Sequence, residues 1–116
     1  MGRKANTITL SATFSLLAMV NLATPAQAAA PNCTSNVCYY QKAEYKGNQI
    51  TSAAKKGICY KDKEIESLIV TLKKGEEIRV YSGTNCKGAH NFDMGKGTFA
   101  DIPASVGWIG QSYKRI

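Results

Sequence analysis

An internal repeat constrains the fold of this 116-residue chain more than any other feature of its sequence. The segment YQKAEYKG begins at Tyr40, and the segment YSGTNCKG begins 41 positions later, at Tyr81. Aligning the two tyrosines places Gly47 opposite Gly88, so the same aromatic-to-glycine spacing occurs twice. A repeated unit of this length cannot bury its own apolar face, so the two copies are expected to pack against each other.

Short runs of β-forming residues alternate with turn-forming residues through the rest of the chain. This pattern is typical of the strands in all-β sandwiches and barrels. No stretch keeps a helical period long enough to compete, and PASVGW at 103–108 is expected to be a loop. The predicted strands are 37–41, 49–53, 58–61, 67–72, 78–82, 89–94, 98–102 and 111–116.

The repeat also predicts which side of its first strand faces the core. Side chains alternate between the two faces of a strand. Val37 and Tyr39 therefore point the same way, as do their apolar counterparts Ile78 and Val80 in the second copy. We expect these four side chains in the core, and Cys38 on the opposite face.

The first 28 residues have the three-part pattern of a secretory signal peptide. A basic start is followed by a mostly apolar run at 8–23, and small residues at 26–28 form a cleavage site. The alternative is a membrane anchor, which needs about 20 predominantly apolar residues and so is longer than this run. Removal of 1–28 leaves 29–116, which we expect to be a single, secreted, monomeric domain.

The positive charges of the mature chain are scattered. The formal net charge is +7, and it falls to +5 without Arg3 and Lys4 of the signal peptide. Scattered lysines usually form a solvated surface, whereas a nucleic-acid site needs a dense basic strip. We therefore expect no nucleic-acid partner, and attraction to an acidic cell surface or protein stays open.

Four cysteines lie in the mature chain, and an even number in a small exported domain predicts two disulfides. A zinc site is the alternative, but no C-x-x-C spacing occurs and the chain has a single histidine. Because Cys38 is expected off the core face, the simplest of the three pairings joins it to Cys33. That pairing leaves Cys59 to bond with Cys86.

The repeated motif resembles the Greek-key signature of the βγ-crystallins: an aromatic, four residues, an aromatic, one residue and glycine. Residues 40–47 match it fully, and 81–88 match it except at Cys86. The family also has a serine near the start of each fourth strand, where Ser67 and Ser112 stand. The resemblance implies a sandwich of two Greek keys, at 37–72 and 76–116. The fold-motif residues are Tyr40, Tyr45, Gly47, Tyr81, Gly88, Ser67 and Ser112.

Many microbial members of that family bind calcium through acidic or amide residues followed by Ser or Thr. In DKEIES, at 62–67, Lys63 and Glu66 depart from this pattern, and GWIGQS at 107–112 departs at most positions. Asp62, Glu64 and Glu66 could still bind an ion in another arrangement, but a solvated acidic loop accounts for them. We expect no tight calcium site, no other metal and no cofactor.

The segment APNCTSNVCYY, at 30–40, resembles the start of secreted actinomycete peptidase inhibitors of βγ-crystallin shape, which include an inhibitor of metalloproteinases. A loop held by a disulfide loses little entropy when it docks into a peptidase, although small exported domains also need such bonds for stability. Two such loops are candidates for partner binding. Their residues are Thr34, Ser35, Asn36 and Val37 in the first, and Gly83, Thr84, Asn85 and Lys87 in the second.

Nothing in the sequence predicts an enzyme. His90 is the only histidine, and Asp93, three positions on, falls on the other face of a strand. No catalytic residue is therefore assigned, since acid–base catalysis needs groups that converge. Trp108, the only tryptophan, is expected either to fill the core or to anchor a partner.

Three functions remain compatible with these observations. We favour a non-catalytic inhibitor of extracellular peptidases, with metallopeptidases as the preferred class. The alternatives are an antimicrobial or killer-toxin-like protein that acts on acidic cell envelopes, and a stable extracellular protein with only a structural role.

Overall fold

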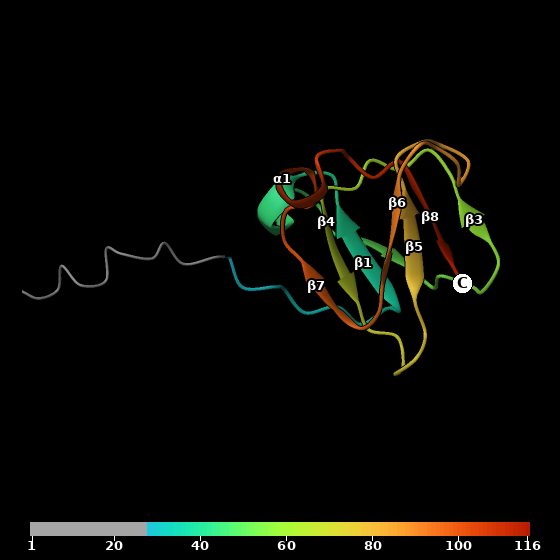
Figure 1. The fold of residues 1–116 in the computed structure, drawn as a ribbon. Helices are drawn as coiled ribbons and strands as arrows, with labels where there is room; N and C mark the ends of the chain where they lie inside the picture. The colour runs from blue at the N-terminus through green and yellow to red at the C-terminus, as the bar shows by residue number, and fades with distance from the viewer. Residues whose placement is uncertain (1–27) are drawn as a thin grey trace, which may run out of the picture.

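A computed structural model describes residues 28–116, so the predicted signal sequence lies almost wholly outside the described part (Figure 1). The expected eight strands are present within this part, together with two short helical segments. In chain order the elements are β1 (Val37–Tyr40), η2 (Ala43–Tyr45), β2 (Ile50–Ser52), β3 (Cys59–Tyr60), β4 (Ser67–Val70), β5 (Ile78–Tyr81), β6 (Asn91–Met94), β7 (Gly97–Phe99), α1 (Ile102–Val106) and β8 (Ser112–Arg115).

The strands form two four-stranded antiparallel sheets, in the orders β2-β1-β4-β7 and β3-β8-β5-β6. Each repeat contributes three strands to one sheet and its third strand to the other sheet. Thus β3 of the first copy pairs with β8, and β7 of the second copy pairs with β4. This exchange confirms the predicted sandwich of two Greek keys, and it ties the two copies into one hydrogen-bonded unit.

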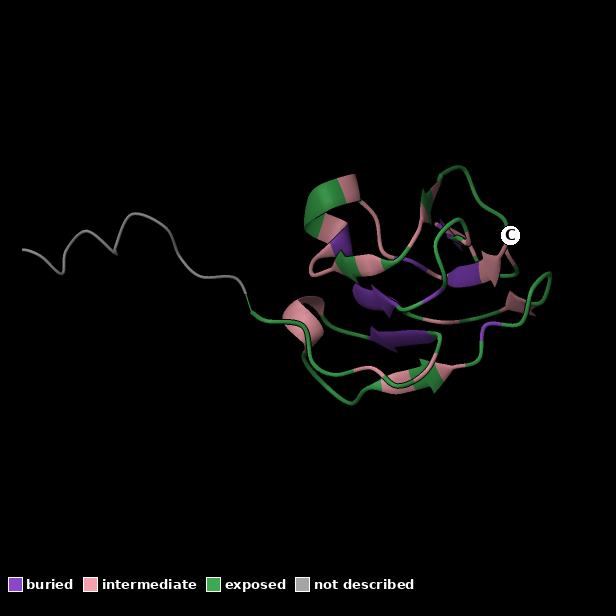
Figure 2. Cartoon of the chain, turned by 90° about the horizontal axis from the view of Figure 1, so that it is seen from below, coloured by how far each residue is buried: buried purple, intermediate pink, exposed green. Residues whose placement is uncertain are grey.

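The predicted core face is confirmed. Val37, Tyr39, Ile78 and Val80 are all almost fully buried, and they belong to one cluster between the sheets. Tyr113 of β8 lies in the same cluster, where its burial raises the pKa of its hydroxyl well above the usual range. Figure 2 shows the buried stretches concentrated in the central strands and the exposed ones in the connecting loops.

The two sheets differ on their outer faces. Cys38 faces outward on β1 but is also fully buried, in a second cluster with Tyr40 and Ile69 against which Cys33 packs. The segment that precedes β1 therefore closes this face, an arrangement that strand alternation alone does not predict.

On the other sheet, the position equivalent to Cys38 is Arg79, which remains partly exposed. Its Nε donates to Asp93 Oδ1 at 2.6 Å, across the β5–β6 pair. The hydrogen bond from Arg79 holds the pKa of the Asp93 carboxyl below its usual value, and the charge of the guanidinium acts in the same direction. An exposed ion pair of this kind adds little to stability. This outer face therefore carries charged side chains in contact with solvent, whereas the N-terminal segment covers the outer face of the other sheet.

The expected loop at 103–108 is corrected by the structure, because α1 begins at Ile102. Asp101 Oδ1 accepts a hydrogen bond from Ala104 N at 3.0 Å, and Pro103 occupies the first turn. Gly107, with φ 86°, ends the helix in the left-handed conformation. These are ordinary capping signals, but a five-residue helix is too short to show a helical period. The preceding strand ends at Phe99, not at 102.

Within residues 28–116 no helix combines the length and the apolar character that crossing a bilayer requires.

Candidate functional site

The two hairpin corners that come after β1 and β5 have the same backbone shape. Glu44 and Tyr45 have φ values of 58° and 59°, and Asn85 and Cys86 have values of 61° and 54°. Two successive non-glycine residues in the left-handed region are uncommon. Tyr45 and Cys86 therefore occupy equivalent places, although their side chains differ.

In the first corner, Ser67 of β4 holds the turn in place. Its Oγ accepts a hydrogen bond from Tyr45 N at 3.1 Å and donates one to Lys42 O at 2.7 Å. The Tyr45 ring packs edge-on against Tyr40, with 5.7 Å between the ring centroids. An aromatic contact thus covers the first corner from outside.

In the second corner, Ser112 of β8 performs the same task. Its Oγ accepts from Cys86 N at 2.8 Å and donates to Gly83 O at 2.6 Å. The covering contact is covalent here, because Cys86 is bonded to Cys59 of β3. The disulfide takes the place of the aromatic lid of the first copy.

Replacing Ser112 with alanine is expected to lower the free energy of unfolding by about 1–3 kcal/mol, because a partly buried backbone donor and acceptor lose their partner. Ser67→Ala should cost a similar amount, since both hydroxyls are fully buried and each makes two hydrogen bonds. Urea denaturation monitored by circular dichroism measures both changes. A loss below about 0.5 kcal/mol in either variant contradicts the assigned role of that corner serine.

The second candidate loop lies on this corner. Thr84, Asn85 and Lys87 are exposed and Gly83 is partly exposed. Gly83 N donates to Lys87 O at 2.9 Å, which closes the loop on itself. Its exposed residues lie around a tight left-handed turn rather than along an extended path.

The first candidate loop, called the ring loop below, is the segment that the Cys33–Cys38 disulfide closes. Thr34 and Asn36 are exposed and Ser35 is partly exposed. The prediction of Val37 as a contact residue is wrong, because Val37 begins β1 and its side chain is fully buried in the core.

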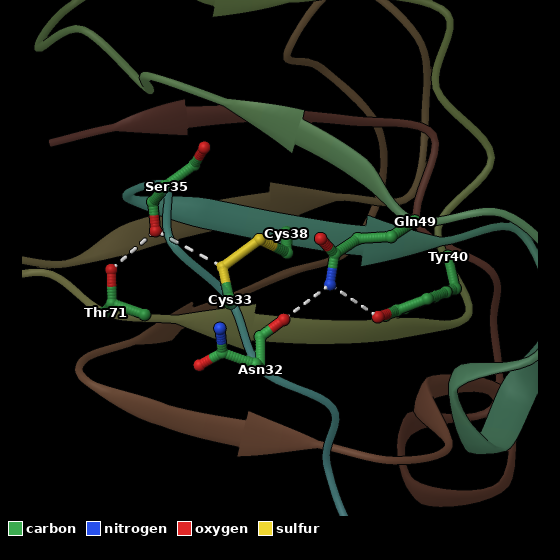
Figure 3. The surroundings of a disulfide bond; sticks show 7 residues. All are labelled: Asn32, Cys33, Ser35, Cys38, Tyr40, Gln49 and Thr71. Atoms are coloured by element: carbon green, nitrogen blue, oxygen red, sulfur yellow. Dashed lines mark hydrogen bonds between the residues drawn. A yellow bond between two sulfur atoms is a disulfide. The ribbon is translucent and has the colours of Figure 1, made fainter.

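Residues far along the chain fix the ends of this ring loop (Figure 3). On the C-terminal side, Thr71 donates from Oγ1 to Ser35 O at 2.6 Å and from its backbone N to Asn36 O at 2.9 Å. On the N-terminal side, Gln49 Nε2 donates to Asn32 O at 2.9 Å. No sequence motif marks Thr71 or Gln49 as partners of this loop, because only the fold brings them together.

Gln49 is itself held by the sheet, since its Nε2 also donates to the hydroxyl of Tyr40 at 2.7 Å. In Figure 3, Gln49 and Tyr40 lie on one side of Cys33. Ser35 and Thr71 lie on its other side. The ring loop is therefore braced from both flanks as well as by its disulfide.

The remaining candidate residues do not form a reaction centre. His90 is exposed, and its ring lies 6.3 Å from that of Trp108. Trp108 is half-buried and packs against Phe92 at the margin of the core, so it partly fills the core as one of the two expectations had it. Asp93 is held by Arg79.

The two segments that were compared with the calcium motif, 62–67 and 107–112, lie side by side. Lys63 N donates to Gln111 O at 2.7 Å, and Ile65 and Gly110 exchange two backbone hydrogen bonds. In residues 28–116, no group of three or more His, Cys, Asp or Glu side chains gathers in a way suited to a metal.

We expect millimolar calcium to leave the melting temperature of the protein unchanged, because the loop backbones bond to each other and Lys63 places a positive charge among them. Differential scanning calorimetry with calcium and with chelator measures this directly. A calcium-dependent rise of several degrees contradicts the expectation, because ligand binding to the folded state raises stability.

Comparisons with known proteins support the fold and assign this chain to a family. The model of peptidase inhibitor family I36 matches residues 26–92, which include both candidate loops. Among solved structures, IPSE/alpha-1 from Schistosoma mansoni eggs, a protein of βγ-crystallin fold, is similar with a TM-score of 0.54 and 19% sequence identity. The similarity covers 72% of this chain and 86% of that one. A search of curated protein sequences finds no match. Because the family model matches more than half of its residues, this chain belongs to peptidase inhibitor family I36.

Proposed function

We propose that this protein is secreted and that it inhibits an extracellular peptidase, with metallopeptidases as the favoured class and without catalytic activity of its own. The observation that carries the proposal is the match to peptidase inhibitor family I36 over residues 26–92. The resemblance of 30–40 to the start of secreted inhibitors, one of which acts on metalloproteinases, favours that class.

The architecture supports inhibition for a physical reason. A loop that is rigid before binding loses little conformational entropy when it enters a cleft, and this raises its affinity. Both exposed loops meet this condition, since each is tied to a β-sheet by a disulfide and by hydrogen bonds.

The test uses the full chain expressed in a secreting host, with the protein purified from the medium. Thermolysin, subtilisin and papain represent metallo-, serine and cysteine peptidases, and each is titrated with the protein. We expect near-stoichiometric loss of thermolysin activity and an N-terminus at Ala29. A reduced and alkylated sample controls for simple competition by an unfolded substrate.

Inhibition of subtilisin or papain alone would keep the coarser proposal and reject the metallopeptidase preference. Growth arrest of bacterial or yeast cultures, with no inhibition of any of the three peptidases, would favour the antimicrobial alternative. Retention of the protein inside the cell contradicts the proposed secretion.

A further inference from the structure

We propose that the turn at 55–58, called the cationic turn below, binds the surface of a bilayer that contains acidic phospholipids. Ile58 is the apolar tip of this turn, and the lysines around it are the contacts for the acidic headgroups. Neither of the two candidate loops for peptidase binding belongs to the turn, so the proposal does not rest on the inhibitory function.

The tripeptide KKG occurs twice in the chain, and each copy opens a turn that joins two strands. In the first turn Ile58 N donates to Lys55 O at 3.2 Å, and in the second Glu76 N donates to Lys73 O at 3.1 Å. Both turns have a glycine with positive φ in third place, as such four-residue turns often do. Because the two turns share these features, the fourth residue is the main difference between them.

Acidic residues offset the charge of the second turn. Glu76 Oε1 accepts a hydrogen bond from Lys73 N at 3.1 Å, and its Oε2 pairs with Arg115. Glu77 comes next in the chain, so the two lysines of this turn are followed by two carboxylates. The second turn therefore has no excess of positive charge in its own sequence.

The cationic turn lacks such an offset. The segment 55–61 contains three lysines and no Asp or Glu, and Asp62 is the first acid beyond it. The strand register places Lys114 opposite Cys59, which adds a fourth lysine. None of these four lysines forms an ion pair within residues 28–116. Because β3, which follows the turn, is an edge strand, these charges lie at the periphery of the sandwich (Figure 1).

Ile58 gives the cationic turn an apolar tip. Its side chain is 51% exposed, and no other large apolar side chain of residues 28–116 is classed with it as exposed. One exposed apolar residue is ordinary on a protein surface, but this one stands between lysines. At a membrane interface, lysines attract acidic headgroups while an apolar side chain enters the boundary between headgroups and acyl chains. A soluble acidic polymer would use the lysines alone, so Ile58 favours a bilayer.

The test measures how the secreted protein, purified from the medium, binds to sedimented lipid vesicles in the absence of any peptidase. One set of vesicles mixes phosphatidylglycerol with phosphatidylcholine, and the other contains phosphatidylcholine alone. We expect binding to the acidic vesicles, roughly tenfold weaker binding to the neutral ones, and loss of binding at high salt, because salt screens the lysines. Equal binding to both sets, or binding to neither, would overturn the proposal.

Joint replacement of Lys55 and Lys56 by glutamine is expected to weaken binding to the acidic vesicles by about 30-fold, since each lysine near such a surface contributes about fivefold. The matched control replaces Lys73 and Lys74 by glutamine, which removes the same charge from the other KKG turn. This control should change binding by less than about threefold, because its carboxylates already oppose contact with an acidic surface. Equal losses in the two variants would mean that net charge alone governs binding, and the cationic turn would be wrong as the site.

Ile58→Ser keeps every charge, and it is expected to weaken binding to the acidic vesicles about fivefold through the lost burial of an apolar side chain. Circular dichroism confirms that each variant is folded. Binding that depends on Lys55 and Lys56 but not on Ile58 would indicate a soluble acidic polymer or protein as the partner, and it would rule out the bilayer.

Discussion

Joint replacement of Cys59 and Cys86 by serine is expected to lower the free energy of unfolding by about 3.5 kcal/mol. The bond joins cysteines 27 positions apart, and it links β3 to the hairpin corner of the second copy. In the chain-entropy model, opening a loop of this size returns that freedom to the unfolded chain. Chemical denaturation monitored by the fluorescence of Trp108, the only tryptophan, measures the loss.

The matched control removes the other disulfide. Cys33 and Cys38 are only five positions apart, so the same model gives about 2 kcal/mol for their joint replacement by serine. The second double variant should therefore stay clearly more stable than the first. The reverse order would mean that burial of Cys38 under the N-terminal segment outweighs the entropy of the unfolded chain.

Gly88→Ala is expected to destabilise the protein by about 3 kcal/mol or more, because it combines backbone strain with a steric clash. Gly88 has φ 133°, a conformation that L side chains rarely adopt. An added Cβ would also lie 2.5 Å from Gly83 N and 2.6 Å from Ser82 Oγ, within the same corner. Thermal and urea unfolding of the purified variant measure the effect.

The equivalent glycine of the first copy provides the comparison. Gly47 has φ 88°, but an added Cβ there would meet no atom within 4 Å. Gly47→Ala should therefore show the strain alone, about 1–2 kcal/mol. If Gly88→Ala and Gly47→Ala lose the same stability, the corner accommodates the added Cβ at Gly88 at no cost. The predicted steric clash with Gly83 is then wrong.

Much of the fold was predictable from local sequence patterns. The strands, the core face of Val37 and Tyr39, and the equivalence of the two corners come from alternation and from a spacing that occurs twice. Helix α1 was not predictable in this way, because its evidence consists of caps at Asp101 and Gly107 without a period between them. The paired disulfides were predictable from the register of Cys38 and from the small number of alternatives.

The candidate site was only partly predictable. Both exposed loops were expected, but the left-handed conformation of Asn85 and Cys86 was not, because the hydrogen bond that holds this turn comes from Ser112 of a distant strand. The burial of Val37 removes one of the expected contact residues, although its position in a core strand already implied this.

The sandwich could be predicted from the sequence alone, since the spacing from Tyr40 to Gly47 and from Tyr81 to Gly88 is a local property that a single chain can display. The way in which the ring loop is held depends on tertiary contacts instead. Its anchors come from Gln49, 17 positions beyond Asn32, and from Thr71, 36 positions beyond Ser35. Contacts over such separations depend on the packing of the whole sandwich, and that packing fixes the backbone on either side of Thr34.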